Sequence, residues 1–324
     1  MVAGLAACSG DTGVDPTVSA PALNPTEKPA ESKPPEANIL ATATSESPPK
    51  VLQAPEGVDE VERVKQFVDA PDRDLFRLTK ELVPGSGDIP RTLPGDAVEF
   101  SVGHTETFWL VDLTDTETYQ SDFRLVLVTP RAYWYLEDGL DISMSGLERS
   151  ASRFEEDIYP AVTEVFGTEW TPGIDNDPRL NILNARLRGV AGYFSSADEH
   201  PQAVYEHSNQ RETIYVNTRS LRVGSQVYHE VLAHELQHAA HWNADSSEET
   251  WINEGLSELA ISVAGYSSDS GNRYLNTPNI PLIHWPLGHQ NIGAHYGGAS
   301  LFMSYLSEHY GAQGNLRQLV SEPK

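Results

Sequence analysis

The segment from residue 231 to residue 242 carries the residue types and spacing of a metal site. It reads Val-Leu-Ala-His-Glu-Leu-Gln-His-Ala-Ala-His-Trp and contains the pattern His-Glu-x-x-His at His234, Glu235 and His238. Two histidines four positions apart on an α-helix are offset by roughly 40° and 6 Å, so they share one face. Imidazoles at this spacing can bind one zinc ion, and Glu235 can take a proton from a water molecule there. The pattern therefore indicates zinc-dependent hydrolysis.

A catalytic zinc site needs a third protein ligand and leaves one coordination position for water. The pattern with a third histidine six residues after the second is excluded, because Ala244 stands there. His241 lies nearly a helical turn beyond His238, and three successive turns do not converge easily on one ion. We therefore expect His241 at the surface or beside a ligand. The remaining option is a carboxylate from a following helix, and Glu254 begins an apolar helical run that could supply it.

A second motif surrounds this carboxylate. Residues 251–258 read Trp-Ile-Asn-Glu-Gly-Leu-Ser-Glu, and fifteen residues separate His238 from Glu254. Together the two motifs resemble the gluzincin group of zinc metallopeptidases and are most similar to its hyicolysin-type neutral metallopeptidases. The resemblance covers roughly residues 140–311 and is strongest at the motifs themselves.

The resemblance implies a role for each residue of the two motifs. It implies three zinc ligands, His234, His238 and Glu254. It makes Glu235 the general base. It also implies that Glu258 hydrogen-bonds a zinc histidine and that Asn253 supports the ligands. Such a partner determines the tautomer and orientation of an imidazole.

Peptide hydrolysis also needs a hydrogen-bond donor for the oxyanion. The segment that begins at His295 resembles a gluzincin aminopeptidase segment in which a tyrosine precedes a glycine-containing helix. Tyr296 is therefore the expected donor, with His295 as the alternative. Peptidases of this group commonly bind an extended peptide along an edge strand, and residues 189–194 or 213–216 could form it. The aminopeptidase signature of the Gly-x-Met-Glu-Asn type is absent, which favours an endopeptidase acting on peptides or proteins.

Two other functions are compatible with these residues. A non-catalytic zinc-binding surface lipoprotein could keep the ligands of a decayed peptidase. A structural zinc site would have four protein ligands, however, and no fourth ligand is obvious in the sequence. Hydrolysis of a non-peptide amide is the other alternative, and no residue pattern separates it from peptide hydrolysis.

Charge and cysteine content restrict the partners and the location of the chain. The formal net charge is −25, so nucleic acid would be repelled and is excluded as a partner. Leu5-Ala-Ala-Cys8 followed by Ser-Gly-Asp resembles a bacterial lipobox, in which the cysteine is lipidated. We therefore expect a lipid anchor on the extracellular face of a bacterial membrane, or secretion if Cys8 is not modified. Residues 1–8 would then be the remnant of a signal peptide.

The first half of the chain must position the motif helix without supplying chemistry. Residues 9–57 are rich in Pro, Ser, Thr, Ala and Glu, which predicts a disordered linker. Residues 58–83 could form short amphipathic helices. Four runs then have the alternation or the β-branched and aromatic content of strands, namely Val98–Val102, Thr107–Leu113, Phe123–Thr129 and Ala132–Leu136. We predict a β-rich N-terminal domain over residues 58–138.

The second half, residues 139–324, is predicted to be the metallopeptidase domain. Apolar periodicity predicts a helix over 142–166, and the motif helix is predicted over 225–242. The predicted strands are Leu180–Leu183, Gly192–Phe194 and Thr213–Val216. The Asp175-Asn-Asp177 turn could bind Ca²⁺, although turn chemistry alone explains it more simply.

The predicted fold class is α+β, a zincin-like domain with a preceding β-rich subdomain and a disordered N-terminal tether. Hyicolysin-like proteins usually continue with further helices beyond the position that corresponds to Tyr310. The resemblance therefore implies a short C-terminal subdomain. The sequence predicts no oligomeric state.

Overall fold

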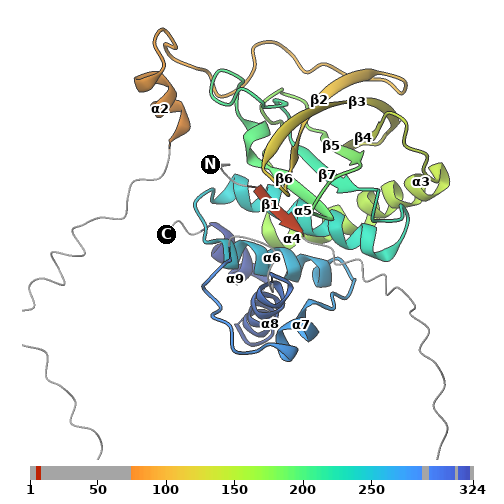
Figure 1. Cartoon of the computed structure of the whole chain (residues 1–324), viewed down its shortest axis with the longest axis vertical. Helices are drawn as coiled ribbons and strands as arrows, with labels where there is room; N and C mark the ends of the chain where they lie inside the picture. The colour runs from red at the N-terminus through yellow and green to blue at the C-terminus, as the bar shows by residue number, and fades with distance from the viewer. Residues whose placement is uncertain (1–4, 9–73, 287–291, 311–312, 322–324) are drawn as a thin grey trace, which may run out of the picture. The chain divides into compact units, whose positions relative to one another are not determined.

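A computed structural model describes residues 5–8, 74–286, 292–310 and 313–321. The fold is a mixed α+β arrangement in which helices pack against one curled sheet (Figure 1). The strands are β1 (Leu5–Cys8), β2 (Thr105–Asp112), β3 (Glu117–Val128), β4 (Ala132–Glu137), β5 (Leu180–Ala185), β6 (Gly192–Ser195) and β7 (Thr213–Asn217). Their order across the sheet is β1-β6-β7-β5-β4-β3-β2.

The centre of the sheet is parallel and its margins are antiparallel. β4, β5 and β7 run parallel to one another, whereas β6 runs antiparallel to β7 and β3 antiparallel to β4. Every residue of these three parallel strands is buried, as expected for strands covered on both faces. Successive side chains alternate, so Trp134 packs with the helices while Tyr133 and Tyr135 fill a second core on the other face.

The helices form two groups. Against the sheet lie α3 (Met144–Arg153), a π-helical turn (Phe154–Ile158), α4 (Tyr159–Phe166) and α5 (Gln226–Ala244). Beyond α5 lie α6 (Thr250–Val263), α7 (Ser270–Asn276), α8 (Ile292–Tyr310) and α9 (Gln313–Ser321), and α2 (Leu75–Leu82) precedes the sheet (Figure 1). α6 packs on both α5 and α8. None of the described helices combines the length and apolar character that crossing a membrane requires.

Most predicted elements are confirmed. The helix predicted over 142–166 is present as α3, the π-helical turn and α4, and it ends at Gly167, where φ is 97°. The later part of the helical prediction over 58–83 is present as α2. Residues 58–73 lie outside the described residues, as does the predicted linker over 9–57.

The strand predicted at Val98–Val102 is wrong. Val98 is 63% exposed and Val102 is 62% exposed, and the segment pairs with no strand of the described sheet. Only the central Phe100 turns inward, where its ring packs edge-on against Tyr133 at 5.7 Å. Alternating apolar residues therefore mark a loop here.

The predicted division near residue 138 does not separate two bodies. β4 ends at Glu137, yet it pairs in parallel with β5 from Leu180 onward. The residues from 74 onward that the structure describes belong to one compact unit. The β-rich segment is thus the first part of the same sheet that supports the motif helix.

Candidate metal site

α5 carries the His-Glu-x-x-His motif and is buried around most of its circumference. Ser225 caps its start, because the Ser225 hydroxyl accepts a hydrogen bond from the Tyr228 N–H at 3.3 Å. Every residue from 231 to 241 is buried. The helix therefore holds its histidines in the protein interior, where polar groups without partners are costly.

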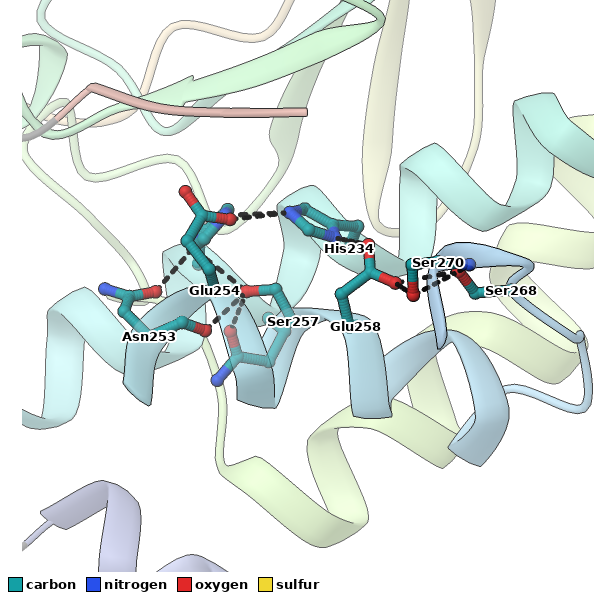
Figure 2. Close-up of polar contacts among 9 residues, drawn as sticks. His234, Asn253, Glu254, Ser257, Glu258, Ser268 and Ser270 are labelled. Carbon is teal, nitrogen blue, oxygen red and sulfur yellow. Dashed lines mark hydrogen bonds and ion pairs between the residues drawn. The ribbon is translucent and has the colours of Figure 1, made fainter. Parts of the chain in front are cut away.

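α6 packs against α5 and brings Glu254 to the two histidines (Figure 2). His234 Nε2 lies 3.2 Å from Glu254 Oε2 and 3.1 Å from His238 Nε2. His238 Nε2 lies 3.4 Å from the same Glu254 oxygen. Three ligand atoms from two helices thus form a nearly equilateral triangle.

The triangle has the dimensions that a zinc ion requires. Metal–ligand bonds of 2.0–2.1 Å in tetrahedral geometry place neighbouring ligand atoms about 3.3 Å apart. The three separations of 3.1, 3.2 and 3.4 Å match that edge. His234, His238 and Glu254 are 0%, 1% and 3% exposed. In the part of the chain that the structure describes, they form the one group of three such side chains whose ligand atoms all lie within 4.8 Å.

The charges at the triangle suit a cation. Burial by itself would raise the pKa of Glu254, but His238 and His234 outweigh burial and bring this pKa well below its usual range. Burial lowers the pKa of His238. Metal binding needs an ionised carboxylate and neutral imidazoles, so Glu254 and His238 are already in the required form.

His238 is oriented by side chains of α6. Asn253 Oδ1 lies 2.5 Å from His238 Nδ1 and accepts its proton, which leaves Nε2 free to face the triangle. The Ser257 hydroxyl lies 3.0 Å from the same nitrogen and also donates to Gln237. Asn253 was predicted to support the ligands, whereas Ser257 and Gln237 were missed.

His234 has a different neighbour. Glu258 Oε1 lies 3.6 Å from His234 Nδ1, so the predicted carboxylate partner stands beside His234 and not His238. The other oxygen, Glu258 Oε2, accepts hydrogen bonds from Ser268 at 2.8 Å and from Ser270 at 2.6 Å. No sequence motif marked these two serines.

Glu235 lies between α5 and strand β6. It is 0% exposed, and neither carboxylate oxygen has a hydrogen-bond partner in the described structure. Oε1 lies 3.1 Å from the position that a Cβ at Gly192 would occupy. Burial raises the pKa of Glu235 to about 8, against the opposing effect of His234. The carboxylate is therefore close to both the ligands and the backbone of β6.

The two predicted oxyanion donors occupy different surroundings at the start of α8. The Tyr296 ring lies 6.2 Å from the His234 ring and 5.0 Å from Trp285, measured between centroids. His295 packs against His284 and Trp285 at 6.1 and 6.0 Å, and burial lowers its pKa. Tyr296 is thus the one that neighbours a ligand, and Trp285 is a further neighbour that the sequence did not indicate.

His241 is not at the surface. It is 0% exposed, and its Nδ1 lies 3.4 Å from the Gln237 side-chain nitrogen. Burial lowers the pKa of His241 to about 4. Because Gln237 accepts from Ser257, His241 is connected to the surroundings of His238 through two side chains, in keeping with the alternative expectation that it lies beside a ligand.

Turn chemistry accounts for the Asp175–Asp177 segment. Asp177 Oδ2 accepts from the Tyr133 hydroxyl at 2.8 Å, and Oδ1 accepts from Arg179. Asp175 Oδ1 accepts from the Asp177 N–H at 3.0 Å. Ca²⁺ binding here stays a prediction without support from the ligand geometry.

The structure distinguishes the two strands predicted as peptide-binding edges. β7 pairs with β5 on one side and β6 on the other, so it is not an edge. β6 pairs with β7 and, on its outer side, with β1, which contains Cys8. Lipidation of Cys8 is not tested by this pairing.

No protein-family model matches the chain, and no curated protein matches its sequence.

Proposed function

We propose that this chain is a zinc-dependent endopeptidase with a zincin-like fold. The observation that carries the proposal is the triangle of His234 Nε2, His238 Nε2 and Glu254 Oε2, whose edges of 3.1–3.4 Å suit tetrahedral zinc. Three protein ligands leave one position open, as in catalytic sites, whereas structural zinc sites are closed by four. Bound zinc supplies Lewis acidity, which lowers the pKa of water and polarises a carbonyl group.

The chain's own residues would move the proton and stabilise charge. Glu235 accepts a proton from the attacking water and returns it to the leaving amine. A pKa of about 8 suits a carboxyl group that must both accept and release a proton near neutral pH. Tyr296 donates a hydrogen bond to the oxyanion, with His295 as the alternative donor.

The position of β6 supports a peptide as the substrate. An extended peptide can add to a sheet edge through backbone hydrogen bonds. Glu235 faces β6 at Gly192, so a peptide along this strand would pass close to the general base. The proposal also includes anchoring through Cys8 at the extracellular face of a bacterial membrane, or secretion without that modification.

The test compares three forms of the full chain for bound zinc and for casein hydrolysis. We expect about one zinc ion per chain in the parent, in Glu235→Gln and in a control, Glu230→Gln. Glu230 lies on the same helix, where it accepts a hydrogen bond from Gln226 at 2.7 Å. Hydrolysis should fall by roughly 10²–10⁴-fold in Glu235→Gln and stay near the parent rate in the control.

Each other outcome has a definite meaning. Full activity in Glu235→Gln would contradict the proposed general base. Zinc without hydrolysis in the parent would favour the non-catalytic zinc-binding protein. Cleavage of simple amides but not of casein would favour the non-peptide hydrolase.

A further inference from the structure

The contacts of Glu258 extend from the metal triangle to the start of α7. The hydroxyls of Ser268 and Ser270 both donate to Glu258 Oε2, at 2.8 and 2.6 Å. Ser268 Oγ also accepts a hydrogen bond from the Ser270 N–H at 3.2 Å, so one turn holds both hydroxyls (Figure 2). Neither serine belongs to the sequence motifs of the site.

This arrangement restrains Glu258 and leaves its second oxygen for His234. Oε1 lies 3.6 Å from His234 Nδ1, a nitrogen that has no hydrogen-bond partner in the described structure. A buried carboxylate with one oxygen held by two donors cannot rotate freely, so Oε1 stays directed at Nδ1. That direction favours a proton on Nδ1 and leaves the Nε2 lone pair facing the triangle.

Ser270 also contacts the helix that carries Tyr296. A Cβ at Gly297 would lie 2.1 Å from the Ser270 carbonyl oxygen, so the two backbones meet as closely as glycine allows. Ser270 therefore touches Glu258 through its hydroxyl and α8 through its carbonyl group. The start of α7 joins the surroundings of a metal ligand to those of the candidate oxyanion donor.

We infer that Ser268 and Ser270 are positioning residues of the proposed metal site, orienting Glu258 so that Glu258 orients His234. The inference rests on the zinc site of the proposed function and not on the reaction that the site performs. It concerns the ligand geometry, so metal binding measures it directly.

The test measures the affinity of the full chain for Zn²⁺ by competition with a chromophoric chelator. The double variant Ser268→Ala/Ser270→Ala should bind zinc roughly 10–100-fold more weakly, the usual effect of losing a group that orients a ligand. Its Co²⁺ absorption spectrum should also differ from that of the parent. Ser268→Thr/Ser270→Thr keeps both hydroxyls and should recover most of the affinity.

A matched control removes a buried serine elsewhere. Ser150 is 0% exposed and its hydroxyl lies 3.0 Å from His229 Nε2, with no contact to Glu258. Ser150→Ala should lower the unfolding temperature but leave the zinc affinity and the Co²⁺ spectrum unchanged. A loss of affinity in this control equal to that of the double variant would reduce the serine effect to general destabilisation and overturn the inference.

A thermodynamic cycle with Glu258→Gln tests the route of the effect. If the serines act through Glu258, removing them in the Glu258→Gln background should weaken zinc binding by less than about threefold further. An undiminished loss in that background, or unchanged affinity in the original one, would overturn the inference. Zinc binding without peptide hydrolysis in the parent would contradict the proposed function alone, and absence of zinc binding would contradict both.

Discussion

At the scale of single residues, sequence predicts a role only where a short spacing encodes it. The motif histidines and Glu254 could be identified because helical geometry relates positions within a few residues. Ser257 and Ser268 contact the site only because α6 and the start of α7 fold back on α5, and serine is too common for its position to signal this. His241 is buried for the same reason, since neighbouring elements cover α5 on all sides.

Gly192 is a residue whose missing side chain matters. A Cβ there would lie 2.5 Å from Val231 Cγ1, 2.8 Å from the Tyr215 carbonyl oxygen and 3.1 Å from Glu235 Oε1. We expect Gly192→Ala to destabilise the protein by about 1–3 kcal/mol, because overpacking forces the strand and helix apart. Peptide hydrolysis should fall by roughly 10–100-fold as Glu235 is displaced.

Denaturant unfolding and casein hydrolysis measure the two effects. Gly293→Ala is the control, since its nearest contact is the flexible side chain of Arg273. A Gly192→Ala protein with the parent's hydrolysis rate would show that Glu235 does not depend on its distance from β6.

At the scale of elements, apolar pattern was informative where burial is complete. β4, β5 and β7 are buried at every position, and their apolar runs predicted them. Val98–Val102 shows the opposite case, because alternation does not reveal whether a partner strand exists. α7 was not predicted, since none of its residues is buried and it carries no apolar periodicity.

The contact between α7 and α8 gives a prediction for these helices. Gly297→Ala would place a Cβ 2.1 Å from the Ser270 carbonyl oxygen, a backbone atom that cannot move away alone. We expect a loss of about 2–3 kcal/mol in unfolding free energy. Gly271→Ala at the same pair of helices meets only the flexible Leu301 side chain, nearest at 3.2 Å, and should be tolerated. Equal stabilities of the two variants in denaturant titrations would contradict this packing.

At the scale of the molecule, the sequence suggested two domains where there is one sheet. The change from β-rich to mixed composition near residue 138 is real, but parallel pairing of β4 with β5 joins residues some forty positions apart. Such pairing leaves no local signal. The same compact unit buries several acids, among them Asp198 and Glu212, each 2% exposed.

These buried acids make stability depend on pH. Burial raises the pKa of Asp198 to about 7 and that of Glu212 to about 8. Between pH 4 and 8 the folded state therefore keeps protons that the unfolded state releases, so the unfolding free energy should fall as pH rises. Glu212→Gln keeps an acceptor for the Ile174 N–H but cannot ionise.

Relative to the parent, Glu212→Gln should gain about 1–3 kcal/mol in unfolding free energy between pH 5 and pH 8. Urea titrations of both proteins at several pH values give this difference, in which other titrating groups cancel. A constant difference across the range would show that Glu212 is ionised in the folded protein at pH 5 already.

The pairing of β1 with β6 has a kinetic consequence. Leu5 lies opposite Ser195 and Cys8 opposite Gly192, so the chain itself lies along the strand that would bind a peptide. A segment of the same chain competes at a local concentration that dilution does not lower. A chain without residues 1–8 should therefore show a lower KM for peptides, with kcat and zinc content unchanged, and an unaltered KM would contradict competition. Cleavage before Cys8, as its motif predicts, would convert a self-inhibited form into an active one.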